Sequence, residues 1–182
     1  MAYSTKKDSS IWLFLHSCCA PCSSAVIERL AGDYNIVIFF SNPNIMPREE
    51  YEKRLSEQKR LVALHGVQLI EDEYENSTFL NAVAGFENEP EGGKRCEKCI
   101  ELRLRRTAEA AKAQGFDFFT TTLSVSSHKN AVLINRILEE KGGQYGVEPL
   151  LADFKKNDGY KRSLELSKKY GLYRQGYCGC RF

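Results

Sequence analysis

The sequence predicts an α/β protein with three layers, in which helices cover both faces of a mostly parallel sheet. The first indication is the alternation of short β-branched or aromatic runs with longer charged amphipathic runs, which is typical of parallel strands joined by helices. The second is the length, because 182 residues suit one domain that buries about 70% of its unfolded surface. The third is the composition, 42% hydrophobic and 27% charged, which is ordinary for a globular chain.

The first third of the chain predicts two strands, each followed by a helix. Residues 11–16 form an apolar run, and Pro21 then suits the first turn of a helix over 21–31. The β-branched and aromatic run at 35–40 predicts the second strand. The charged segment at 47–65 has the periodicity of the second helix.

The middle of the chain predicts a third strand at 67–70, a short helix at 76–84 and a long helix at 95–114. An irregular loop at 85–93, rich in Gly, Pro and Glu, separates the two helices. Gly115 is a suitable residue to end the long helix.

The last third predicts two more strands, two more helices and a tail. The strands are expected at 116–123, which is aromatic and rich in threonine, and at 145–150. The helices are expected at 129–141 and 159–170, and the periodic pattern weakens after the glycine pair at 142–143. The tail, 171–182, consists mostly of Gly, Tyr, Cys and Arg.

These elements are expected to form a single catalytic domain over 11–182, preceded by a polar tail at 1–10. Ligands of parallel sheets bind outside the carboxyl ends of the strands, where the first strand would deliver Ser17 to Cys22. No apolar run approaches the roughly 20 residues that span a bilayer, and the run after the polar tail is too short for a signal-peptide core. We therefore expect a cytoplasmic protein without a membrane partner.

Seven cysteines fall in three groups, at 18, 19 and 22, at 96 and 99, and at 178 and 180. A cytosolic chain is kept reduced, so these residues indicate metal binding or redox chemistry rather than disulfide staples. The first group begins a helix, whose dipole favours thiolate over thiol. Cys96 and Cys99 share one face of a helix. Between Cys178 and Cys180, Gly179 lets the backbone aim both sulfurs at one centre or at each other.

This set of thiols suits two kinds of metal site. Four thiolates would hold a [4Fe–4S] cluster and leave three for a second metal or a redox dithiol, which is the interpretation that we favour. Zinc would take four ligands in a structural site, or three and an open position in a catalytic one. The three histidines, His16, His65 and His128, form no spaced metal pair, and His65 is expected at a helix end.

Four sequence motifs occur in order along nearly the whole chain: L-H-S-C-C-A-P-C-S at 15–23, R-C-E-K-C at 95–99, T-T-L-S-V-S-S-H-K at 121–129 and Y-G-L-Y-R-Q-G-Y-C-G-C at 170–180. Together they resemble the QueH family of epoxyqueuosine reductases. The resemblance implies an iron–sulfur oxidoreductase of queuosine biosynthesis. Its reaction would be the last step, the two-electron reduction of the epoxide of epoxyqueuosine at the wobble position of tRNA, giving queuosine and water.

The resemblance also implies roles for all seven cysteines. The [4Fe–4S] cluster would be bound by Cys18, Cys19, Cys96 and Cys99. The catalytic thiols would be Cys178 and Cys180, as a redox-active disulfide or as ligands of a second mononuclear iron, whose site Cys22 could complete. The fold would be the Rossmann-type layout of PP-loop (HUP-like) tRNA-modifying enzymes, with the metal at the carboxyl ends of the strands and the Cys-Gly-Cys tail folded onto it. Their S-G-G-x-D-S phosphate loop is absent, so ATP is not expected.

The implied partners are a tRNA with a G-U-N anticodon carrying epoxyqueuosine and an external electron donor. RNA phosphates would be bound by cationic residues, namely Lys155, Lys156, Lys161, Arg162 and Arg174. The run Arg103, Arg105 and Arg106 is explained equally well as a further RNA contact and as a solvated helix face. Residue type alone suggests four proton donors, Asp153, Tyr177, His128 and His16.

Two other functions remain open from the sequence. One is a zinc-binding module that docks RNA or protein without chemistry, which would leave three thiols unexplained. The other is a thiol or iron–sulfur oxidoreductase that acts on another tRNA modification. The second alternative shares the site and changes only the substrate.

Overall fold

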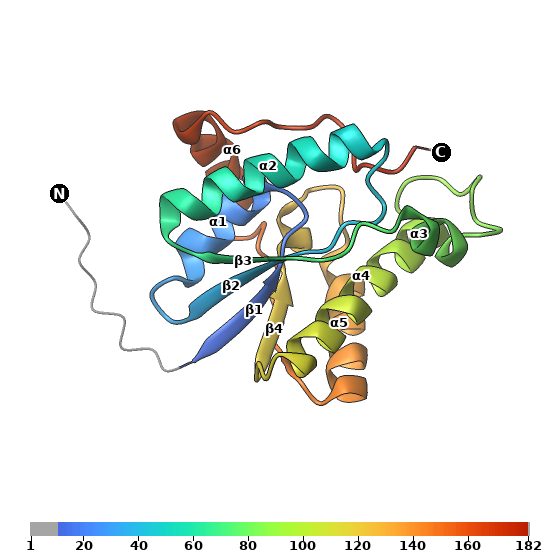
Figure 1. Ribbon diagram of the computed structural model, residues 1–182, viewed down its shortest axis with the longest axis horizontal. Helices are drawn as coiled ribbons and strands as arrows, with labels where there is room; N and C mark the ends of the chain where they lie inside the picture. Colours follow the sequence, from blue (N-terminus) through green and yellow to red (C-terminus); the bar gives the residue numbers. More distant parts are fainter. Residues whose placement is uncertain (1–10, 182) are drawn as a thin grey trace.

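The structure is a computed structural model that describes residues 11–181, so the expected polar tail at 1–10 lies outside the described residues. A sheet of five parallel strands forms its centre, in the order β3-β2-β1-β4-β5 (Figure 1). The strands are β1 (Trp12–His16), β2 (Asn35–Phe40), β3 (Gln68–Glu71), β4 (Phe118–Thr121) and β5 (Glu148–Pro149). All five strands expected from the sequence are present, in a wholly parallel sheet.

Helices cover both faces of this sheet, as predicted (Figure 1). They are α1 (Ala20–Leu30), α2 (Arg48–His65), α3 (Asn76–Ala82), α4 (Lys94–Ala113), α5 (Ala131–Tyr145) and α6 (Gly159–Tyr170). One face is covered by α1 and α2, with α6 packed against α1, and the other by α4 and α5. Within residues 11–181, no helix combines the length and the apolar character needed to cross a membrane.

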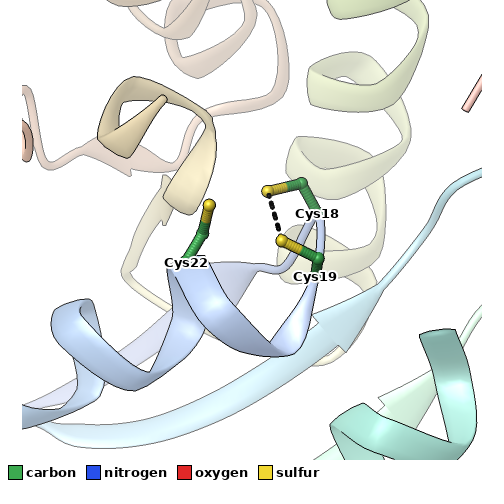
Figure 2. A group of neighbouring side chains, drawn as sticks. All are labelled: Cys18, Cys19 and Cys22. Atoms are coloured by element: carbon green, nitrogen blue, oxygen red, sulfur yellow. Dashed lines mark hydrogen bonds between the residues drawn. The ribbon is translucent and has the colours of Figure 1, made fainter. Parts of the chain in front are cut away.

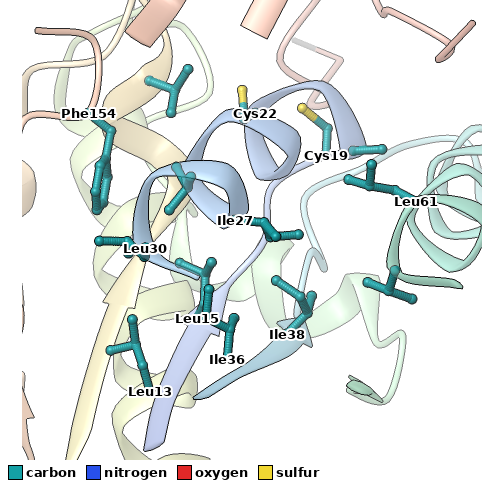
Figure 3. Close-up of a cluster of buried hydrophobic side chains, with 14 of the residues drawn as sticks. Leu13, Leu15, Cys19, Cys22, Ile27, Leu30, Ile36, Ile38, Leu61 and Phe154 are labelled. Carbon is teal, nitrogen blue, oxygen red and sulfur yellow. The ribbon is translucent and has the colours of Figure 1, made fainter. Parts of the chain in front are cut away.

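The alternation of side chains along β1 divides the core between the two faces of the sheet. Leu13 and Leu15 point to the α1 face, where they pack with Ile27 of α1 (Figure 3). Phe14 points to the opposite face and packs with Leu104 of α4. All three β1 side chains are fully buried, because a parallel strand covered on both faces has no solvent side. Its end therefore lies inside the molecule.

Two predicted boundaries near the carboxyl edge of the sheet are corrected by the structure. The strand expected at 116–123 ends at Thr121, whose Oγ1 accepts a hydrogen bond from the Leu123 amide, and a 3-10 turn, η1 (Thr122–Val125), follows. The helix expected to end at 141 continues through the glycine pair to Tyr145. Gly142 is needed there for close packing, because a Cβ atom on it would lie 2.7 Å from the Val147 carbonyl oxygen.

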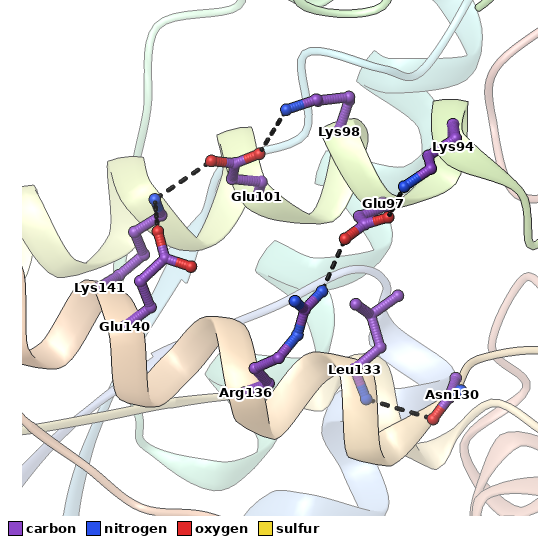
Figure 4. Close-up of polar contacts among 9 residues, drawn as sticks. All are labelled: Lys94, Glu97, Lys98, Glu101, Asn130, Leu133, Arg136, Glu140 and Lys141. Atoms are coloured by element: carbon purple, nitrogen blue, oxygen red, sulfur yellow. Dashed lines mark hydrogen bonds and ion pairs between the residues drawn. The ribbon is translucent and has the colours of Figure 1, made fainter.

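Ion pairs lock α4 to α5, which fixes the helix that carries Cys96 and Cys99 (Figure 4). Lys141 of α5 is nearly buried and contacts Glu101 of α4 at 3.2 Å. Arg136 contacts Glu97 at 2.6 Å one turn before the Glu101 carboxylate. The helix pair is thus held by charges as well as by apolar packing.

Candidate functional site

The first group of thiols lies where β1 passes into α1, at the carboxyl edge of the sheet. Cys18, Cys19 and Cys22 point toward one another (Figure 2), and their three sulfur atoms all lie within 4.8 Å of one another. The turn is fixed by buried Ser17, whose Oγ is 2.7 Å from both Ser23 Oγ and Gln58 Oε1. Hydrogen bonds within the protein therefore hold the turn that carries the three sulfurs.

The electrostatics of this group favour a thiolate at one of its sulfurs. Hydrogen bonds from Cys18 and Cys22 hold the pKa of Cys19 well below its usual range. Hydrogen bonds with Cys18 and Cys19, together with burial, raise the pKa of Cys22. Cys19 immediately precedes α1, so the positive end of the helix dipole also favours its negative form.

The second group joins the start of α4 to the tail. Cys96, Cys99, Cys178 and Cys180 line one small cavity, although they lie up to 84 positions apart in the chain (180 minus 96). Burial raises the pKa of Cys99 to about 11. A hydrogen bond with Cys180, with the nearby charges of Lys129 and Arg103, lowers the pKa of Cys178 to about 5. The Lys129 ammonium lies 3.4 Å from the Cys178 sulfur.

The tail reaches this position by running along α2, and three of its backbone carbonyls are bound there (Figure 1). The fully buried guanidinium of Arg54 donates to the carbonyls of Tyr177 and Cys178, at 3.2 and 3.0 Å. The Met46 amide donates to the Gly179 carbonyl at 2.9 Å. Gly179 has φ +126°, a conformation that favours glycine, and so turns the chain between the two cysteines.

A cavity of about 360 Å³ opens between the two groups, with Cys18, Cys19, Cys22 and Cys178 in its wall. Cations and aromatic rings make up much of the remaining wall, namely Arg54, Arg103, Lys129, Arg174, His128, Tyr160 and Tyr177. This volume lies within the roughly 300–1,000 Å³ of small-molecule sites. Thiols, positively charged side chains and aromatic rings thus line the same cavity.

The structure places the seven cysteines in two groups. Cys22 lies with Cys18 and Cys19, whereas Cys96 and Cys99 lie with the tail cysteines. The expected division, with Cys22 beside the tail pair at a second iron, stays a prediction. All seven cysteines are free thiols in this structure, so no disulfide joins Cys178 to Cys180.

The predicted RNA-binding residues are scattered. Arg174 lines the cavity and lies over the Tyr160 ring at 5.6 Å. Arg162 is engaged by two carboxylates, with 2.7 Å to Glu28 and 2.8 Å to Glu165. Lys155 pairs with Asp153 at 3.0 Å, and Lys156 and Lys161 are exposed outside the cavity wall.

Three cations of the site, Arg54, Arg103 and Lys129, are not predicted from the sequence as part of it, although Arg103 is named there as either an RNA contact or a solvated residue. A solvated helix face is wrong for Arg103, which is only 3% exposed. Its spacing was a usable signal, because Cys96, Cys99 and Arg103 are at i, i+3 and i+7 and so share a helix face. Lys129 closes the third motif, whereas nothing local marks Arg54.

The residues present fit a thiolate-bound metal centre. Cysteine thiolates are the ligands of iron–sulfur clusters and of many zinc sites. Within the described chain, the buried Nε of Arg103 has no hydrogen-bond partner, which suits an anionic group beside it. The donor set thus supports a metal or iron–sulfur centre here.

Solved structures support the fold assignment. The U34-tRNA thiolase NcsA from Methanococcus maripaludis, solved with its [4Fe-4S] cluster, aligns with a TM-score of 0.59 and 14% identity, over 97% of this chain and 63% of that one. A predicted subunit of tRNA methyltransferase from Methanocaldococcus jannaschii aligns with a TM-score of 0.55 and 13% identity, over 86% of this chain and 76% of that one. At these identities the likeness concerns the fold alone, and it confirms the expected three-layer α/β fold with a parallel sheet.

Sequence comparisons bear on the family as well as on the fold. Residues 13–182 match the family model described as epoxyqueuosine reductase QueH. Proteins of that name are 40% identical in Streptococcus pyogenes, over 92% of this chain and 68% of that protein, and 43% identical in Staphylococcus epidermidis, over 93% and 75%. The match contains all three stretches that supply the thiols. By this relationship the chain belongs to the QueH family of epoxyqueuosine reductases.

Proposed function

We propose that this protein reduces the epoxide of epoxyqueuosine in tRNA to the alkene of queuosine. The reaction takes two electrons and two protons and releases the epoxide oxygen as water. The observation that carries the proposal is the family match over 13–182, which includes every cysteine at the cavity. An external donor would supply the electrons, and the cytoplasm, where tRNA is present, would be the compartment.

The cofactor in this proposal is a [4Fe–4S] cluster, which when bound supplies electrons one at a time. Cys18 and Cys19 would bind it from the first group, with Cys96 and Cys99 from α4 as the expected partners. The proximity of Cys22 to Cys18 and Cys19 supports a second arrangement in which Cys22 is the third ligand from α1. Cys178 and Cys180 would then act as a dithiol, or as ligands of a second iron together with a thiol of α4.

The substrate nucleotide would enter the cavity from the side of α6 and the tail. Tyr160 and Tyr177 are 37% and 38% exposed there, which leaves ring surface for an unpaired base. Arg174 carries the positive charge that RNA phosphates attract. Because Arg162 is already paired with carboxylates, we assign the RNA contact to the cavity mouth rather than to the outer face of α6.

The geometry supports two of the four candidate proton donors. His16 is fully buried, its ring nitrogens contact Thr121 Oγ1 and the Ser41 carbonyl, and burial lowers its pKa to about 3. Asp153 is outside the cavity wall. His128 and Tyr177 line the cavity, so we propose that they, directly or through water, protonate the departing oxygen.

The test is to purify the protein without oxygen and to record its visible spectrum, iron content and activity. Incubation with dithionite and tRNA containing epoxyqueuosine should convert the nucleoside to queuosine, as measured by mass spectrometry of the digested tRNA. Cys18→Ala and Cys96→Ala should lose iron and activity. Ser24→Ala is the matched control, because it removes a buried polar side chain from the same helix as Cys22 without removing a thiol. A colourless zinc protein without conversion would contradict the proposal.

A further inference from the structure

Arg103 is a buried cation with no carboxylate partner among the side chains that the structure describes. The residue is 3% exposed, and its guanidinium donates a hydrogen bond to the neutral Asn42 Oδ1. Its Nε has no partner at all among residues 11–181. Burying an uncompensated charge costs several kcal/mol or more, so a compensating anion is expected within reach of this side chain.

The position of Arg103 identifies that anion. The side chain belongs to the walls of both thiol-lined cavities, so it lies between Cys18 of the first group and Cys99 of the second. Asn42 also donates to the Ser17 carbonyl at 2.9 Å, which ties the guanidinium to the turn before Cys18. The nearest groups that can carry negative charge are thiolates, and a thiolate-bound cluster is anionic.

We propose that Arg103 is the counterion of the thiolate-bound centre and that its fixed charge raises the reduction potential of that centre. Reduction adds negative charge to the cluster, so a neighbouring cation stabilises the reduced form more than the oxidised form. Charge and hydrogen bonding at the sulfurs are among the factors that set iron–sulfur potentials. Arg103 is thus a positioning and tuning residue, and this inference rests on the proposed function only in requiring that the centre be an iron–sulfur cluster.

Arginine suits this role better than the neighbouring Lys129. A guanidinium stays protonated at all pH values at which the protein is folded, so its effect on the potential is constant. The Lys129 ammonium already has an ion pair with Glu91 at 3.7 Å. Arg103 is therefore the cation that is available to neutralise negative charge on the proposed centre.

The experiment is an anaerobic redox titration of the iron-loaded protein, followed by visible absorption and electron paramagnetic resonance. Arg103→Gln should reduce the equilibrium constant for one-electron reduction by at least about tenfold, which is about 59 mV toward lower potential. Arg103→Lys keeps the charge and should lie closer to the wild type. Arg105→Gln is the matched control, because it removes the same charge from the same helix outside both cavity walls, and its potential should be that of the wild type.

The outcomes separate this proposal from the proposed function. The wild-type spectrum tests the cluster, whereas the differences among the variants test Arg103. Loss of iron from Arg103→Gln with retention in Arg103→Lys would also support a counterion, because charge would then be what the centre requires. A wild-type potential in iron-loaded Arg103→Gln, or loss of the centre from both variants, would overturn the proposal, since shape rather than charge would then matter.

Discussion

Replacing Gly179 by alanine should weaken the docking of the tail on α2. Gly179 has φ +126°, where an L residue is strained. An added Cβ would also lie 2.9 Å from Ile45 Cγ1 and 3.3 Å from Arg54 Nη1. Both neighbours are almost fully buried, so neither can move away easily. The substitution thus strains the backbone and pushes against the residue that binds the tail carbonyls.

The expected magnitude follows from these two effects. A non-glycine residue at positive φ costs about 1–3 kcal/mol, and overpacking a buried position costs about 1–3 kcal/mol. The opposing contacts are the two Arg54 bonds to carbonyls, each worth about 1.5–3 kcal/mol because the donor is charged, and the Met46 bond to the Gly179 carbonyl, worth about 0.5–1.5 kcal/mol. Even the lower total, about 2 kcal/mol, would shift the docking equilibrium about 30-fold.

Hydrogen exchange at the Met46 amide measures this equilibrium, because that N–H is bonded to the Gly179 carbonyl. We expect exchange at least about 30-fold faster in Gly179→Ala. Gly176→Ala is the matched control, since it is exposed, lies in the same tail and has no atom within 4 Å of an added Cβ. Wild-type exchange in Gly179→Ala would refute the argument that the close packing at this glycine docks the tail.

Two further predictions concern RNA binding and alkaline stability. Arg174→Gln should weaken tRNA binding and reduce the salt slope by about one phosphate contact, whereas Arg162→Gln should leave both unchanged; filter binding across a salt series distinguishes them. Burial raises the pKa of Tyr51 to about 12, from 10 in the unfolded chain, so the folded state keeps a proton that the unfolded state releases. The free energy of unfolding that the Tyr51 hydroxyl contributes is fully present below pH 10 and is lost as the pH rises toward 12. Between pH 9 and 11 the wild type should therefore lose about 1.4 kcal/mol more than Tyr51→Phe in urea unfolding, and equal losses would contradict this assignment.

The layered fold could be predicted because it depends on local pattern. The runs that form β1 and β2 are apolar on both faces, and the helix between them, α1, has a clear periodicity, so each segment indicates its own structure. The proximity of Cys22 to Cys18 and Cys19 is also local, because the three residues span a turn and the first turn of α1. Boundaries at β4 and α5 depend on a threonine cap and on a glycine that packs against another segment, neither of which changes the periodicity.

The second thiol group could not be predicted in the same way. The proximity of Cys99 to Cys180 depends on the path of the tail along α2, and that path is fixed by the buried guanidinium of Arg54. An arginine in a charged helix is usually exposed, so neither Arg54 nor Arg103 could be distinguished from surface cations by residue type. Burial of charge is a tertiary property, and it is most of what the sequence left undetermined at this site.

Each of the three segments that supply thiols is held by contacts that do not involve a metal. Ser17 and Gln58 fix the turn before α1, the ion pairs of Lys141 fix α4 on α5, and Arg54 fixes the tail. These contacts between protein groups position the three segments independently of the thiols, so the proposed centre need not provide the free energy that brings the segments together, in contrast to small zinc modules. The buried charge of Arg103, which has no carboxylate partner, also affects the proposed centre. Since its buried Nε has no hydrogen-bond partner among the described residues, an anionic centre beside it would be favoured, and the same residue would bias both the occupancy and the potential of that centre.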